Sequence, residues 1–200
     1  MAELRLGALE AGGTKMVCAI GDENGEIYEQ VSLPTTTPKE TIPKMIAYFR
    51  DKRIDALGIA CFGPIELDRD SEKYGYITTT PKLAWRDCDI VGQMQEALHC
   101  PVGFDTDVNG SVLGEVTFGQ AQGKKCVMYL TIGTGVGGGV MHQEQLFPLI
   151  RKKLKEYING YIVTDELADM EHYVVPASLH DDQGIMGCLE LARRALENDH

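Results

Sequence analysis

The sequence predicts an α/β fold that opens with three antiparallel strands. Three apolar or alternating segments begin the chain, at residues 4–9, 15–20 and 26–33. Asn24-Gly25, between the second and third segments, is the usual signal for a tight β-hairpin turn. Glycine turns at residues 12–13 and 133–139 each follow an apolar segment, which is typical of a backbone that approaches a ligand closely.

The next segments complete a βββαβ opening. Helical spacing over residues 41–49 leads into the basic cluster 50–53, which suits the negative end of a helix dipole. The mostly apolar segment 54–62 predicts the fourth strand. Residues 63–86 show little periodicity and predict an ordered surface loop around the lone Trp85.

The rest of the chain alternates predicted helices and short strands. We expect helices over residues 90–98, 107–119, 148–158 and 183–197, and strands over residues 102–104, 126–132 and 173–176. Pro148 suits the first position of its helix, where a missing N–H costs nothing, and Asn159-Gly160 suits its end. The last helix carries one apolar stripe formed by Ile185, Leu189, Ala192 and Leu196.

Composition excludes several classes of protein. The 200 residues suffice for one large or two small domains, and the net charge of −11 argues against nucleic-acid and anionic-membrane partners. The longest uncharged stretch, residues 126–141, is rich in glycine and shorter than the roughly 20 apolar residues of a spanning helix. Because the first residues also lack a leader signature, we expect a cytoplasmic location.

The six cysteines are predicted to be reduced and mostly buried. They stand apart, with no Cys-x-x-Cys pair and no neighbouring histidine at the spacing of a metal site. Cytosolic thiols of this kind are usually packing residues.

The segment from Glu10 to Lys15 has some features of a phosphate-binding loop. A P-loop leads into a helix, whereas the residues after Lys15 alternate as a strand. The backbone N–H groups of a glycine hairpin, the Thr14 hydroxyl and the Lys15 ammonium can nevertheless bind phosphate oxygens. An ordinary hairpin turn explains Gly12 and Gly13 equally well.

A second glycine turn, Gly133-Thr134-Gly135-Val136-Gly137, follows the apolar segment 126–132. Bare backbone and one hydroxyl could form another phosphate cradle there, although a flexible connector is the simpler alternative. Two such turns in one chain favour a nucleotide held between two related lobes.

Asp107 lies where a predicted strand meets a predicted helix. An aspartate in this position is commonly a helix N-cap. Phosphoryl transfer to a hydroxyl also needs a positioned carboxylate that accepts the proton, and Asp107 could supply it.

Several segments together resemble bacterial fructokinases of the ROK sugar-kinase family. They are the βββαβ opening, Gly12–Lys15, Cys61–Ile65, Tyr74–Lys82, Thr106–Asn109, Leu113–Glu115 and Thr131–Gly137. That family belongs to the actin-like, Hsp70-like kinases, in which two RNase-H-like lobes close on ATP and a sugar. The resemblance implies an RNase-H-like (actin-like ATPase) lobe over residues 1–119, with helix 183–197 packing back on it, and a reduced second lobe over residues 120–182.

The resemblance also implies roles for the matching residues. Asp107 would be the catalytic base, and Glu10 would reach magnesium through water. The first phosphate loop would be Gly12, Gly13, Thr14 and Lys15, and the second Gly133, Thr134, Gly135 and Gly137. The sugar would be bound by Gly63, Pro64, Thr106 and Asp107. The implied ligands are ATP, Mg²⁺ and a hexose, with fructose expected.

The chain departs from the family pattern after the second phosphate loop. The family carries there a His-Pro-Glu-x-Gly-His sugar motif and a zinc site of histidine and cysteines, and neither is present in this sequence. Two glycine turns are fused into one at residues 135–141, as if an internal block were deleted. We therefore expect no tight zinc site, and exposed apolar surface on helix 149–158 that leads to a homo-oligomer.

The expected function is ATP-dependent phosphorylation of D-fructose at the 6-hydroxyl, weakened by the missing sugar residues. The alternative is a catalytically silent remnant that binds a nucleotide or another subunit. An Hsp70-like ATPase or scaffold has less support, because the loop from Thr78 to Trp85 resembles that of sugar kinases.

Overall fold

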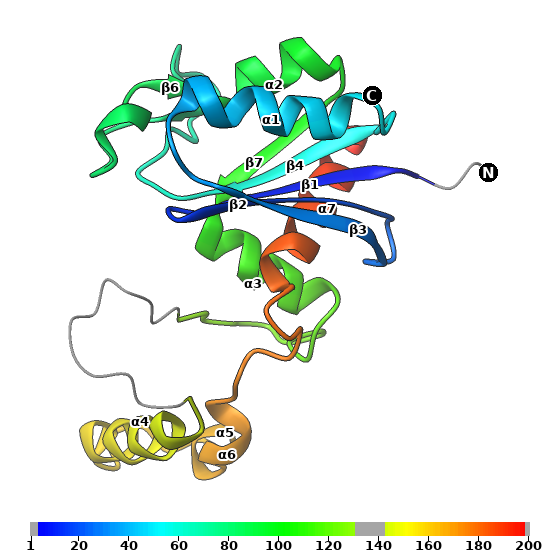
Figure 1. Ribbon diagram of the computed structural model, residues 1–200. Helices are drawn as coiled ribbons and strands as arrows, with labels where there is room; N and C mark the ends of the chain where they lie inside the picture. The colour runs from blue at the N-terminus through cyan, green and yellow to red at the C-terminus, as the bar shows by residue number, and fades with distance from the viewer. Residues whose placement is uncertain (1–3, 131–142, 199–200) are drawn as a thin grey trace. The chain divides into compact units, whose positions relative to one another are not determined.

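The computed structural model describes residues 4–130 and 143–198 (Figure 1). The described residues divide into two compact units. One unit contains the residues up to 130 together with those from 179 onward, and the other contains the residues between them. None of the helices in the described ranges is both long and apolar enough to cross a membrane.

A five-stranded sheet in the order β3-β2-β1-β4-β7 forms the centre of the first unit. Its strands are β1 (Leu6–Ala11), β2 (Lys15–Gly21), β3 (Ile27–Pro34), β4 (Ala56–Cys61) and β7 (Val102–Thr106). β1, β2 and β3 pair antiparallel in chain order, whereas β1, β4 and β7 run parallel. The predicted α/β class and its βββαβ opening are confirmed.

Helices cover both faces of this sheet (Figure 1). One face carries α1 (Pro38–Arg50) and α2 (Ile90–Leu98), and the other carries α3 (Asp107–Thr117) and α7 (Gln183–Asn198). Side chains of a strand alternate between the two faces. In β1, Leu9 and Ala11 therefore enter the core beneath α1 and α2, while Leu6 and Ala8 enter the core beneath α7.

The last helix, α7, packs with its backbone directly against its neighbours. A Cβ atom added to Gly58 of β4 would lie 1.8 Å from the Cys188 carbonyl oxygen. A Cβ atom on Gly187 would lie 1.8 Å from the Gly110 carbonyl oxygen of α3. Glycine at these positions lets α7 approach both the sheet and α3 closely, and Ile185 and Leu189 of its apolar stripe are buried there.

The segment between β4 and α2 is an ordered loop with little regular structure. It contains β5 (Tyr76–Ile77), β6 (Cys88–Asp89) and the short 3₁₀ turn Leu83–Trp85. β5 and β6 pair as a small antiparallel sheet. Trp85 is only 1% exposed, and its indole N–H donates to the Thr36 carbonyl oxygen at 2.8 Å. The lone tryptophan thus anchors the loop to the segment after β3.

The second unit contains α4 (Gln143–Ile158), α5 (Asp165–Ala168) and α6 (Met170–Tyr173). The predicted helix start at Pro148 is wrong, because α4 begins at Gln143 and Pro148 lies inside it. Pro148 is exposed, so water can reach the helix carbonyl that lacks an N–H partner. The predicted strand 173–176 is also wrong, because Tyr173 ends α6 and the residues after it form no strand.

Residues 126–130 form no strand either, and the rest of that predicted strand lies outside the described residues. A strand needs a neighbour for its backbone hydrogen bonds, and none of the described strands pairs with residues 126–130. Among residues 147–178, no side chain is buried. This part of the second unit therefore has no hydrophobic core of its own.

The first unit reaches further along the chain than the bounds of 119 and 183 expected from the sequence. It extends to residue 130 and resumes at residue 179. The Leu179 N–H donates to Glu115 Oε1 at 3.2 Å, and Gln183 Nε2 donates to the Tyr129 hydroxyl at 3.1 Å. These contacts tie both flanking segments to the lobe.

Candidate functional site

Three loops that carry predicted site residues leave the same edge of the sheet. Ala11, Cys61 and Thr106 are aligned partners near the carboxyl ends of the parallel strands β1, β4 and β7. The hairpin 12–15, the Gly63-Pro64 segment and Asp107 follow these strand ends. Ligands of open α/β sheets bind at this kind of edge. The fold therefore brings the predicted phosphate, sugar and base residues of the first lobe to one place.

The hairpin Gly12–Lys15 begins with two glycines, which have no side chains of their own to cover the backbone there. The Gly12 N–H donates to the Lys15 carbonyl oxygen at 3.0 Å, and a Cβ atom on Gly12 would lie 2.7 Å from that oxygen. The backbone N–H groups of Gly13 and Thr14 donate to no protein acceptor within the described ranges. Two unpaired N–H groups in one turn can bind an anion, so the hairpin has the donors that a phosphate group needs.

Asp107 is the first residue of α3, not its cap. The cap is Thr106, whose hydroxyl accepts the Asn109 N–H at 3.1 Å. Asp107 Oδ1 accepts the Val108 N–H at 2.9 Å. Burial raises the pKa of the Asp107 carboxyl above its ordinary value, and the hydrogen bond from Val108 opposes this effect. A raised pKa makes a carboxylate a better proton acceptor.

Glu10 is half-buried beside acidic neighbours and one lysine. Burial raises the pKa of its carboxyl, Lys15 lowers it, and the charges of Asp107, Asp182 and Asp181 raise it further. Its carboxylate lies against Gly184, where an added Cβ atom would be 2.6 Å from Glu10 Cδ. Gly184 is in the first turn of α7, whose positive dipole end stabilises a carboxylate.

Sequence reasoning missed Asp181, Asp182 and Gly184 as neighbours of Glu10. About 170 positions separate them from Glu10 in the sequence, and only the packing of α7 on the sheet brings them together. The available signal was the acidic pair immediately before the apolar stripe of the last helix.

These residues fit a magnesium nucleotide. The free N–H groups of Gly13 and Thr14 suit phosphate oxygens, and the mutual repulsion of Glu10 and Asp107 would be relieved by a nearby divalent cation. No group of three or more His, Cys, Asp or Glu side chains in the described ranges could hold a metal ion. Magnesium commonly uses only one or two carboxylates, with phosphate and water completing its coordination.

The predicted sugar residues Gly63 and Pro64 form the turn after β4, and the peptide bond between them is cis. The Pro64 carbonyl oxygen accepts the Thr78 N–H at 2.8 Å and the Thr78 hydroxyl at 3.1 Å. The turn is thereby fixed to the loop that contains Trp85. The predicted second phosphate loop, Gly133, Thr134, Gly135 and Gly137, lies outside the described residues.

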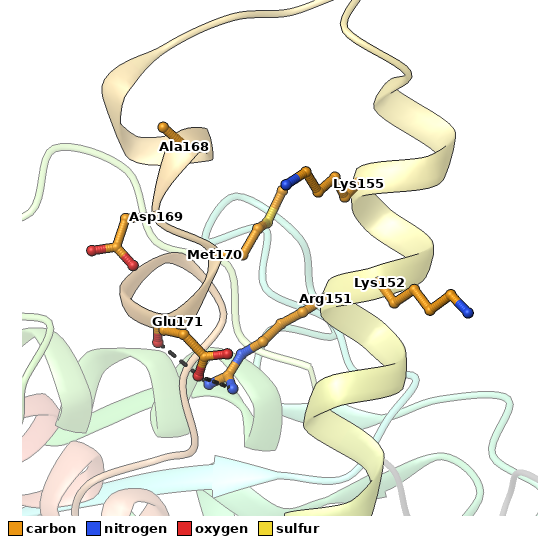
Figure 2. A pocket seen from close by; sticks show the side chains of 7 residues that line it. All are labelled: Arg151, Lys152, Lys155, Ala168, Asp169, Met170 and Glu171. Carbon is orange, nitrogen blue, oxygen red and sulfur yellow. Dashed lines mark hydrogen bonds and ion pairs between the residues drawn. The ribbon is translucent and has the colours of Figure 1, made fainter.

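A separate hollow in the second unit is lined by residues of α4, α5 and α6 (Figure 2). Arg151 of α4 pairs there with Glu171 (Figure 2). Its guanidinium also donates to the Val174 carbonyl oxygen at 2.8 Å. Because the arginine is used in contacts within the unit, the hollow does not present it to a ligand. No predicted site residue lines it.

The sequence is similar to curated bacterial fructokinases. It is 33% identical to the fructokinase of Pediococcus pentosaceus over an alignment of 288 positions, gaps included, which covers 96% of this chain and 99% of that protein. It is 51% identical to the fructokinase of Lactococcus lactis subsp. cremoris over 135 residues, covering 68% of this chain and 46% of that protein. The chain thus spans about half the length of the Lactococcus relative.

The fold is similar to that of a solved kinase, the inorganic polyphosphate/ATP-glucomannokinase from Arthrobacter sp. strain KM. The TM-score is 0.66 at 19% identity, with 96% of this chain and 99% of that chain covered. The family model of the ROK family matches residues 6–147. With a confirmed RNase-H-like sheet and this match over more than half its length, the chain belongs to the ROK family.

Proposed function

We propose that this chain is a sugar kinase of the fructokinase type, which transfers a phosphoryl group from ATP to the 6-hydroxyl of D-fructose. The observation that carries the proposal is the half-buried Asp107 at the same sheet edge as the glycine hairpin Gly12–Lys15. The fructokinase names of its relatives support the choice of sugar.

In the proposed reaction, Asp107 accepts the hydroxyl proton as the sugar oxygen attacks the terminal phosphorus. The Gly13 and Thr14 N–H groups and the Lys15 ammonium hold the phosphate oxygens of the donor. Glu10 would hold the magnesium ion through a water molecule. Bound magnesium ATP supplies the phosphoryl group and neutralises part of the developing charge.

We infer that this activity is weak. In the Pediococcus alignment, about one third of the 288 positions have no counterpart in this chain. The His-Pro-Glu-x-Gly-His motif, which supplies further sugar-binding residues in the family, is absent from the sequence. Correct positioning contributes roughly 7–11 kcal/mol to a reaction of this kind, so its loss strongly slows transfer.

The test is fructose-dependent ADP release by the unaltered chain and by Asp107→Ala. We expect slow release that falls at least about 100-fold in the variant, because general-base catalysis contributes that much. Lys44→Ala, on the exposed side of α1, is the matched control and should leave the rate unchanged. Fast release by the unaltered chain would contradict the inferred weakness, and equal release by Asp107→Ala would contradict the role of Asp107.

A second candidate function is a nucleotide-binding or subunit-associating remnant without turnover. The absence of buried side chains over residues 147–178 favours it, because that segment cannot form a closed second lobe alone. Magnesium ATP binding without any fructose-dependent ADP release would support this alternative.

A further inference from the structure

We propose that Lys82 is a phosphate-binding residue that reaches the first glycine hairpin from the loop between β4 and α2. A Cβ atom added to Gly13 would lie 3.3 Å from Lys82 Cε, so the lysine side chain lies directly over the hairpin. This inference rests on the phosphate-binding part of the proposed function and adds a second cation to Lys15.

The ammonium group of Lys82 has no partner in the part of the chain that the structure describes. No hydrogen bond, ion pair or ring contact of Lys82 Nζ occurs among the described residues, although the side chain is half-buried. Lys52 and Lys73, by contrast, form ion pairs of 2.7 Å with Glu29 and Asp87. In a chain with thirty acidic and nineteen basic residues, an unpaired half-buried lysine is available to an external anion.

Hydrogen bonds fix the backbone of Lys82 relative to the hairpin. Thr35 binds the hairpin twice, through its hydroxyl to the Gly12 carbonyl oxygen at 2.7 Å and through its N–H to the Thr14 carbonyl oxygen at 3.0 Å. The next residue, Thr36, accepts the indole N–H of Trp85. The Trp85 N–H in turn donates to the Lys82 carbonyl oxygen at 2.8 Å. These hydrogen bonds link the hairpin to Lys82 through Thr35, Thr36 and Trp85, and they hold the lysine at the hairpin.

The chemistry of this arrangement suits a phosphate group. An ammonium has three donors, and the Gly13 and Thr14 N–H groups of the same turn have no acceptor among the residues that the structure describes. Charge-assisted hydrogen bonds to phosphate oxygens are about twice as strong as neutral ones. The phosphate could belong to the nucleotide donor or to a phosphorylated sugar, because both present the same phosphate oxygens to these donors.

The test is calorimetric titration of the whole chain with magnesium triphosphate, which carries phosphate without a nucleoside or a sugar. We expect Lys82→Ala to weaken binding about tenfold or more and Lys82→Arg to retain most of it. Lys73→Ala, which removes one charge from the same loop, is the control and should bind as the unaltered chain does. Parallel titrations with magnesium ATP and with fructose 6-phosphate identify the source of the phosphate.

A second measurement needs no variant. Acetylation of lysines in the unaltered chain, mapped by mass spectrometry, should be slowed at Lys82 by triphosphate but not at Lys73. Equal triphosphate affinity of Lys82→Ala, or no protection of Lys82, would overturn the role of Lys82 and leave the proposed kinase function standing. Failure of the unaltered chain to bind triphosphate at all would overturn this role and the phosphate-binding hairpin together.

Discussion

Asp107 and Glu10 hold negative charges in half-buried positions, and burial raises the pKa of both carboxyls. A carboxyl whose pKa is higher in the folded state than in the unfolded state binds its proton more tightly in the folded state. Ionisation of such a group therefore lowers the free energy of unfolding as pH rises through the folded pKa. The penalty is absent at a pH below the unfolded pKa of about 3.9 for aspartate. The candidate base is thus maintained at a cost in stability.

We expect Asp107→Asn to unfold at a higher urea concentration than the unaltered chain at pH 7. The amide removes the charge but keeps an oxygen that can accept the Val108 N–H. The gain should shrink as pH falls toward the unfolded pKa, because the carboxyl is then protonated in both states. Asp70→Asn, on the exposed loop, serves as the control. A variant less stable than the unaltered chain at pH 7 would contradict this reading.

Residue patterns in the sequence located part of this site. The strand–helix junction marked Asp107, and the glycines marked the hairpin, because backbone requirements are local. The position of Lys82 over Gly13 could not be predicted, since it depends on hydrogen bonds that join segments far apart in sequence. Assignment of the cap to Thr106 likewise needed the observed hydrogen bond to Asn109.

At the scale of elements, the close contact of α7 with the sheet restricts which residues the sequence can carry at the interface. A carbonyl oxygen of a helix backbone occupies the space that a side chain at Gly58 would need. Backbone atoms cannot rotate away as side chains do, so α7 would have to move as a whole. The close packing of this helix makes glycine necessary there.

We therefore expect Gly58→Ala to lower the free energy of unfolding by about 1–3 kcal/mol or more, because the added methyl group overpacks the interface. Urea unfolding followed by circular dichroism measures the change. Gly63→Ala is a suitable comparison, since its added carbon would lie 3.6 Å from the nearest atom. Equal midpoints for Gly58→Ala and the unaltered chain would show that α7 is not docked as described.

The elements of the first unit could be predicted because their apolar spacing matches the burial they acquire in the fold. α2 has the bounds that were expected, and β1 is displaced by only two residues. The sequence-based predictions failed for segments whose secondary structure depends on contacts with distant parts of the chain. Residues 126–130 have the apolar character of a strand but pair with none of the described strands, and α4 continues through Pro148 at an exposed position.

At the scale of the whole molecule, the second unit exposes large apolar side chains. Tyr157 is 84% exposed, Tyr161 is 93% exposed and Val163 is 85% exposed. Exposed apolar side chains near one another commonly mark association surfaces. Homo-oligomer formation through this unit therefore remains our prediction.

We expect light scattering at micromolar concentration to report a dimer or a larger species. The double variant Tyr157→Ser, Tyr161→Ser should shift the chain toward the monomer, because it removes apolar area from the contact. Leu83→Ser, which removes an exposed leucine of the first unit, should leave the mass unchanged. A monomer for the unaltered chain would refute the prediction.

The return of α7 to the first unit has a consequence for how this family can change in length. For that unit, the chain between Leu130 and Leu179 is an insertion, since the residues on both sides belong to the same unit. The entropy of loop closure depends only on the logarithm of loop length. Adding to this segment as many positions as the Pediococcus relative has in excess would change this term by on the order of 1 kcal/mol. An ATPase-like lobe closed by its own last helix can therefore persist while the inserted lobe shrinks or grows.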